Sequence, residues 1–177
     1  MADQGVFAVR ERSDRSAALS DSDWLPQRQP CSQVPTSSLE HPTTIAFGQD
    51  AVLVFDEVPP QWLLPAIQQM AAIGNLKENW DSCGGRPIDP RCVAGAAEFL
   101  LRTGLPGGPL PSVVPTNRGG VQLEWHCAAV DLEIEFLSAS RFRVFFEDLR
   151  SGENAEFETI GDFRRVVPYL KRLVEAN

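Results

Sequence analysis

Carboxylate side chains in the second half of the chain are the residues whose types and spacing best suit chemistry. Glu124, Asp131, Glu133, Glu135 and Glu147 alternate with apolar residues. Because successive side chains of an extended strand point to opposite faces, this alternation puts the carboxylates on one face of a sheet. Carboxylate oxygens bind Mg²⁺ or Mn²⁺, and such ions catalyse hydrolysis of phosphodiesters and related bonds. One hypothesis is therefore a metal-dependent hydrolase or nuclease that binds its ion through Glu124, Asp131 and Glu133.

The turns between these strands predict which side chains face each other. If Ala128 begins a two-residue turn, Glu124 lies opposite Glu133 on the same face. A three-residue loop after the next strand then places Glu135 opposite Arg143 as an ion pair. Two directly opposed carboxylates repel each other by several tenths of a kcal/mol unless a cation, an arginine or a binding partner compensates. The opposed pair therefore predicts a surface that a positively charged neighbour would stabilise.

Three interpretations of this acidic face are open: a solvated surface of an acidic protein, a contact surface for a basic protein, and the metal site. The metal site has the least support, because the chain has no lysine between Lys77 and Lys171. The sheet would therefore lack the lysine that often accompanies such carboxylates in metal-dependent nucleases.

A cysteine nucleophile is a further hypothesis. Cys83 lies in a glycine-rich loop, and His126 and Asp131 would complete a Cys–His–Asp arrangement if the fold brought them together, although their spacing does not require it. The four cysteines include no C-x-x-C pair, so neither a structural zinc site nor a disulfide framework is expected. Because the chain also lacks a dinucleotide-binding or phosphate-loop motif, we expect no cofactor.

The segment 79–87, Asn-Trp-Asp-Ser-Cys-Gly-Gly-Arg-Pro, combines residues with local backbone roles. Asp81 can accept hydrogen bonds from nearby backbone N–H groups, the glycines permit positive φ, and Trp80 supplies a large anchor. Such a loop either presents N–H groups to a ligand or partner, or connects two helices in a fixed way. We include Trp80, Asp81, Gly84 and Gly85 among the candidate partner-binding residues.

A second motif, Gly-Gly-Val-Gln-Leu-Glu-Trp at 119–125, opens a strand with a double glycine. Together with the loop at 79–87 and the Leu-Glu-Ile-Glu strand at 132–135, it resembles a family of small, uncharacterised bacterial proteins. The similarity covers roughly residues 60–147, and the family commonly has glycine where this chain has Ser82. The resemblance implies a shared α+β fold and a bacterial source. It implies no activity, since none is attached to the family.

The elements that position these motifs follow from hydrophobic periodicity. The pattern predicts a hairpin over 43–55, a helix over 64–74 that ends at a left-handed glycine, a helix over 89–104, and a C-terminal helix over 161–176 that Pro168 interrupts. Between the last two helices, alternating apolar and polar residues predict a meander of four to five antiparallel strands. Helices before and after a run of strands predict an α+β fold in two layers.

Composition limits the class of protein. The chain has 177 residues, of which 43% are hydrophobic, and a formal charge of −8. We predict a flexible tail rich in Ser, Pro and Gln over 1–42 and a single domain over 43–177. The acidic excess disfavours nucleic acid as a partner. No apolar stretch reaches the roughly 18 residues of a membrane span, and the first residues contain no signal-peptide core, so we expect a cytoplasmic protein.

These inferences favour a non-enzymatic protein that binds a basic protein partner, of the inhibitor, antitoxin or immunity type. The expected contact residues lie on the acidic sheet face and on the glycine-rich loop: Glu124, Asp131, Glu133, Glu135, Arg143, Trp80, Asp81, Gly84 and Gly85. The metal-dependent hydrolase is the alternative. Because the C-terminal helix is basic and the rest of the chain acidic, self-association also stays open.

Overall fold

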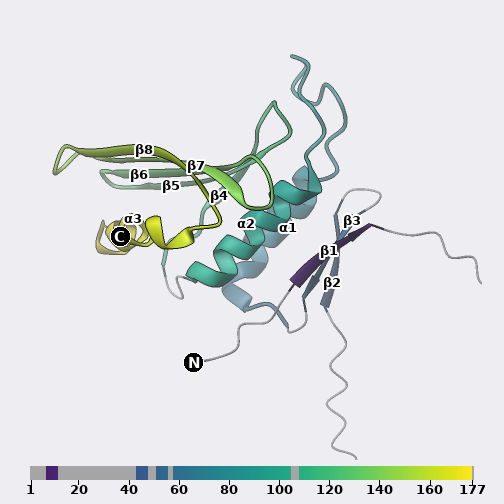
Figure 1. The fold of residues 1–177 in the computed structure, drawn as a ribbon, viewed down its shortest axis with the longest axis horizontal. Helices are drawn as coiled ribbons and strands as arrows, with labels where there is room; N and C mark the ends of the chain where they lie inside the picture. Colours follow the sequence, from purple (N-terminus) through teal and green to yellow (C-terminus); the bar gives the residue numbers. More distant parts are fainter. Residues whose placement is uncertain (1–6, 12–42, 48–50, 56–57, 105–107, 177) are drawn as a thin grey trace, which may run out of the picture.

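Five antiparallel strands form the main sheet of the protein, whose computed structural model describes residues 7–11, 43–47, 51–55, 58–104 and 108–176 (Figure 1). They lie side by side in chain order because each connection between β5 and β8 is a short turn. The strands are β4 (Ser112–Pro115), β5 (Val121–Cys127), β6 (Val130–Phe136), β7 (Arg141–Asp148) and β8 (Glu153–Ile160).

Apolar residues alternate with polar ones along these strands, and the apolar set faces the helices. On β6, Leu132 and Ile134 are fully buried, whereas Glu133 between them is half-buried. The same pattern on β5 and β7 gives the sheet one face in the core and one face toward solvent.

The predicted register is confirmed at two hairpins. A two-residue turn that begins at Ala128 pairs Glu124 with Glu133, and a three-residue loop pairs Glu135 with Arg143. Ala128 has φ 52°, the left-handed conformation that two-residue hairpin turns favour. The positions of the opposed side chains therefore follow directly from the lengths of the turns.

Helix α2 (Pro90–Thr103) lies against the inner face of the main sheet and begins where the sequence predicts. The Asp89 carboxylate caps it by accepting a hydrogen bond from the Arg91 N–H at 2.8 Å, and Pro90 occupies the first turn, where its missing N–H costs no hydrogen bond. Gly104 ends the helix.

Helix α1 (Leu64–Ile73) follows a short 3₁₀ helix, η1 (Gln61–Leu63), and contacts β4 of the main sheet (Figure 1). The prediction of a left-handed cap at Gly74 is wrong, because this residue has φ −65°. The chain continues in the right-handed sense through two further turns, in which Asn75 N–H donates to Ala72 O and Leu76 N–H donates to Ile73 O.

The C-terminal segment is split, as the position of Pro168 predicts. It forms a 3₁₀ helix, η2 (Phe163–Arg165), and then helix α3 (Val167–Ala176). Pro168 lies in the first turn of α3, where no intrahelical N–H bond is lost. Helix α3 buries Leu170 and Leu173 against the main sheet beside α2.

A second antiparallel sheet lies on the side of α1 and α2 away from the main sheet (Figure 1). Its strands are β1 (Phe7–Glu11), β3 (Ala51–Phe55) and β2 (Thr43–Phe47), in that order. The sequence predicts the β2–β3 hairpin but not β1, which lies within the predicted tail; the rest of that tail, 1–6 and 12–42, lies outside the described residues. The α+β class is confirmed, and this sheet adds a layer to the two that the sequence predicts.

Aromatic packing holds α2 and η2 to the main sheet. The rings of Phe99, Phe136, Phe142 and Phe163 have centroids 5.4 to 6.3 Å apart. Phe99 belongs to α2, and its ring meets the inner face of β6 and β7. Such clusters bury large apolar areas, so this face of the sheet supplies the core and the opposite face is left to carry polar side chains.

Candidate functional site

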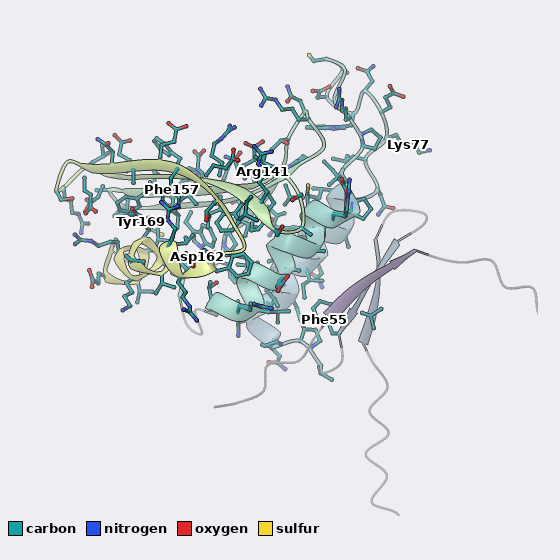
Figure 2. All side chains as sticks on the ribbon, viewed as in Figure 1. Phe55, Lys77, Arg141, Phe157, Asp162 and Tyr169 are labelled. Atoms are coloured by element: carbon teal, nitrogen blue, oxygen red, sulfur yellow. The ribbon has the colours of Figure 1, made fainter. Side chains whose placement is uncertain are left out.

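The outer face of the main sheet, which points away from α2 and α3, carries the candidate site (Figure 2). Because paired residues on antiparallel strands share a face, the register defines its members. We call this surface the acidic face. On β5 to β8 it consists of Gln122, Glu124, His126, Asp131, Glu133, Glu135, Arg141, Arg143, Phe145, Glu147, Asn154, Glu156, Glu158 and Ile160.

An amide lies between the two opposed glutamates. Gln122 Nε2 donates to Glu124 Oε1 at 3.1 Å and to Glu133 Oε2 at 2.8 Å. The sequence predicts that a cation, an arginine or a binding partner offsets the repulsion between these glutamates. In the structure, the neutral amide of Gln122 offsets it instead. Both carboxylates are consequently held in fixed positions.

His126 continues this arrangement toward the hairpin turn. Its Nδ1 lies 2.7 Å from Asp131 Oδ1, and its Nε2 lies 3.5 Å from Glu124 Oε2. The hydrogen bond with Asp131 and, to a smaller extent, that with Glu124 raise the pKa of the His126 imidazole above its usual 6.5. A continuous chain of polar contacts therefore runs from Glu133 through Gln122, Glu124 and His126 to Asp131.

The two arginines of the acidic face each pair with one carboxylate. Arg143 Nη1 lies 3.5 Å from Glu135 Oε2, and Arg141 Nε donates to Glu158. The hydrogen bond from Arg141 lowers the pKa of the Glu158 carboxyl. Glu147 and Glu156 have no ion-pair partner among the residues that the structure describes. The face thus keeps an excess of negative charge after its internal pairs are formed.

Phe145 lies within this charged surface. Its side chain is 39% exposed, and its cross-strand neighbours are Glu133 on β6 and Glu156 on β8. The outer face therefore carries one partly exposed aromatic ring between two carboxylates.

The metal-site alternative gains no geometric support. Among the described residues, no group of three or more His, Cys, Asp and Glu side chains is arranged to hold a metal ion. Gln122 separates the carboxylates of Glu124 and Glu133, and the Asp131 carboxylate is turned to the His126 ring.

The glycine-rich loop at 79–87 satisfies its polar groups internally. Asp81 Oδ1 accepts hydrogen bonds from the N–H groups of Cys83 and Gly85, both at 2.8 Å, and these bonds lower the pKa of its carboxyl. Trp80 Nε1 donates to Arg86 O at 3.1 Å. These contacts favour the interpretation of this segment as a fixed connection between helices.

This loop also packs on the turn that opens β5, so the two motifs identified in the sequence form one structural unit. Arg86 N–H donates to Asn117 O at 3.0 Å, and Asp89 N–H donates to Gly119 O at 2.8 Å. Gly119 has φ +88°, and a Cβ there would lie 2.7 Å from Pro87 O. A residue with a side chain is therefore disfavoured here for two reasons: its Cβ would clash with Pro87 O, and its backbone would have to adopt a positive φ.

The structure therefore divides the predicted contact residues into two groups. Glu124, Asp131, Glu133, Glu135 and Arg143 lie together on the acidic face. Trp80, Asp81, Gly84 and Gly85 belong to the packed loop, and no hydrogen bond or ion pair of the described residues joins them to the carboxylates of that face.

The cysteines do not form a catalytic arrangement with His126 in the described part of the chain. Both ring nitrogens of His126 are engaged by carboxylates, and Cys83 is exposed in the packed loop. Cys92 is buried in the core, and this burial raises the pKa of its thiol to about 12.

Sequence reasoning missed three features of the site. It did not assign Gln122 as the bridging amide, did not single out Phe145, and did not extend the acidic face to Glu156 and Glu158 on β8. The alternation in β8 was a usable signal, because it places these two glutamates on one face. Which face of the sheet these glutamates occupy depends on how β8 pairs with β7, and this pairing is set by the length of the turn after Asp148.

Comparison of the chain with protein-family models, with curated proteins and with solved structures finds no match. Among the described residues, no helix combines the length and apolar character needed to cross a membrane.

Proposed function

We propose that this protein is a non-enzymatic binding protein whose acidic face contacts a basic surface on another protein. The observation that carries the proposal is the exposed Phe145 ring between Glu133 and Glu156, on a sheet face where carboxylates outnumber arginines. Aromatic anchors supply much of the binding energy of protein interfaces, whereas surrounding charges steer and orient the partner.

The contacts within the face support this proposal. Gln122 and His126 hold Glu124, Glu133 and Asp131 in place before any partner arrives. Side chains that are already ordered lose less conformational entropy on binding, so their charges contribute more to affinity.

Charge complementarity indicates the kind of partner. Proteins that bind nucleic acids carry clustered Lys and Arg side chains that neutralise phosphates. A protein that covers such a cluster with carboxylates would block it, which fits an inhibitor, antitoxin or immunity-type role in the cytoplasm. The basic partner is thus a toxin or nuclease, or another protein with a comparable positive surface.

The test begins with capture of partners from the native host on the wild-type protein. Each captured protein is then purified, and its affinity is measured for wild type, for Glu124→Lys/Glu133→Lys on the acidic face, and for Glu78→Lys/Glu175→Lys as a matched control. The control makes the same charge change at two exposed residues off the face. Folding of each variant is checked by circular dichroism and thermal unfolding.

We expect the face variant to weaken binding of a basic partner by at least about tenfold, and the control to change it by less than about twofold. Equal losses of affinity in both variants would show that only the net charge of the protein matters, and would contradict the proposal. Unchanged affinity in the face variant would contradict it as well.

A further inference from the structure

The two edges of the main sheet differ in how they are protected. The β4 edge is short, ends at Pro115, and is blocked at Val113, whose N–H donates to Gln69 Oε1 of α1 at 3.0 Å. Strand β8 has eight residues, no proline, and a pairing with β7 alone among the strands that the structure describes. No described strand pairs with its other side, which is therefore an edge of the sheet as far as the described residues go (Figure 1).

The register identifies the backbone groups on that edge. Gly161 N–H donates to Ser140 O at 2.8 Å, next to the pair formed by Ile160 and Arg141. Hydrogen-bonded and non-hydrogen-bonded pairs alternate along antiparallel strands. The N–H and C=O groups of Ala155, Phe157 and Thr159 therefore point to β7, and those of the intervening residues, Asn154, Glu156, Glu158 and Ile160, point outward.

These outward-pointing residues also present their side chains on the acidic face. Glu156 and Glu158 are exposed, and Ile160 is 72% exposed at the end of the strand. Arg141 of β7 pairs with Glu158, whereas Glu156 has no ion-pair partner among the described residues. The edge thus offers backbone hydrogen-bonding groups, one unpaired carboxylate, one carboxylate shared with Arg141, and one apolar side chain in a single row.

A second copy of this chain is a poor occupant. Pairing two β8 strands would bring glutamates of both copies close together on one face, and like charges on adjacent strands are destabilising. The same carboxylates favour a strand that carries Lys or Arg at alternate positions.

We propose that β8 binds an extended basic segment of the partner protein as a sixth strand of the sheet. Alternate Lys or Arg side chains of that segment lie beside Glu156 and Glu158, and an apolar residue packs near Ile160. The main-chain hydrogen bonds provide affinity and the side-chain row provides selectivity. This inference rests on the proposed function, because it specifies how the basic partner engages the acidic face.

A ten-residue peptide of alternating lysine and threonine serves as the probe. Its matched control carries a methyl group on the backbone nitrogen of every lysine, which keeps the charge but removes the N–H groups that would bond to β8. Binding is measured by fluorescence anisotropy. We expect the methylated peptide to bind the wild-type protein at least about tenfold more weakly than its parent.

Two variants of β8 make the complementary change on the protein. Glu156→Pro removes one outward N–H together with a charge, and Glu156→Gln removes the charge alone. Proline is tolerated at edge positions whose N–H faces solvent, so β8 should stay paired with β7. We expect Glu156→Pro to weaken parent-peptide binding several-fold more than Glu156→Gln.

Amide hydrogen exchange of the wild-type protein tests the inference without a substitution. In the free protein the amides of Asn154, Glu156, Glu158 and Ile160 should exchange faster than those of the residues between them. The parent peptide should slow the exchange of this outward set. An unchanged rate in the peptide-bound protein would overturn the inference.

The outcomes separate this inference from the proposed function. If both peptides bind equally and Glu124→Lys/Glu133→Lys abolishes binding, the acidic face binds basic chains without strand pairing, and the inference fails alone. If neither peptide binds, the inference also fails, and the purified partner then decides the proposed function.

Discussion

Gln122 lets two opposed glutamates coexist on adjacent strands. A carboxylate pair at this register position repels, and the sequence alone predicts a cost. The side-chain amide donates to both carboxylates, 3.1 Å from Glu124 and 2.8 Å from Glu133. A single neutral residue therefore turns a repulsive pair into an ordered part of the surface.

Replacing Gln122 by Leu should expose that repulsion. Hydrogen bonds to charged groups contribute roughly 1.5–3 kcal/mol, so we expect the free energy of unfolding to fall by about that amount, with the larger loss at low salt. Urea unfolding measures the change. Adding Glu133→Gln to the variant should recover most of the loss, because it removes one of the two charges; no recovery would assign the effect to packing.

His126 should make part of the stability depend on pH. Asp131 and Glu124 contact its ring, and Glu147 lies across from Asp131 on β7. The raised pKa in the folded protein means that this contribution is fully present below the usual value of 6.5 and is lost as pH rises through the folded-state pKa.

We therefore expect the stability difference between wild type and Asp131→Asn to be largest below pH 6.5 and to shrink at higher pH. An NMR titration should show the His126 pKa moving down toward its usual value in this variant. Asp162→Asn, at an exposed carboxyl before η2, is the control and should leave the His126 titration unchanged.

At the scale of elements, the loop at 79–87 and the turn before β5 form a rigid unit. Backbone hydrogen bonds from Arg86 and Asp89 join the two segments, and Gly119 allows them to approach closely. This unit sets the start of β5 and hence the positions of Gln122 and Glu124 on the acidic face. The motif residues of the loop thus affect the site through the strand that they position.

Substitution of Gly119 by Ala tests this contact. The φ of +88° alone costs an L-residue roughly 1–2 kcal/mol, and the clash with Pro87 O should add about 1–3 kcal/mol. Gly152→Ala is the matched control, since Gly152 has φ +72° but a Cβ added there would have no atom within 4 Å. Thermal and urea unfolding should show a clearly larger loss for Gly119→Ala; equal losses would mean that the contact contributes nothing.

At the scale of the whole molecule, the charges of the acidic face and the Phe145 ring should affect different rate constants of binding. Carboxylates of the acidic face act at long range and should govern the association rate and its dependence on salt. Phe145 acts only on contact and should govern the dissociation rate.

We therefore expect Phe145→Ala to raise the dissociation rate of the purified partner by about tenfold or more and to leave the salt dependence of association unchanged. Glu124→Lys/Glu133→Lys should do the reverse, mainly lowering the association rate at low salt. Surface plasmon resonance at several salt concentrations measures both rates. An effect of Phe145→Ala on association alone would show that the ring is not an anchor.

Much of the fold could be predicted because local rules decide it. Asp89 and Pro90 mark the start of α2, Pro168 breaks the C-terminal helix, and alternation with short turns sets the register that opposes Glu124 to Glu133. Strand β1 could not be predicted, because its pairing with β3 joins segments that are far apart in the chain, whereas β2 and β3 are joined by a short local turn.

The sequence by itself determined which side chains share the acidic face of β5 to β7, since strand period and turn length are local properties of the chain. Only the tertiary structure decided what those side chains do. It bonded Gln122 to both glutamates, packed the loop at 79–87 against Gly119, and left β8 as the open edge. These outcomes depend on side-chain positions and on contacts between separate segments of the chain, which residue spacing does not encode.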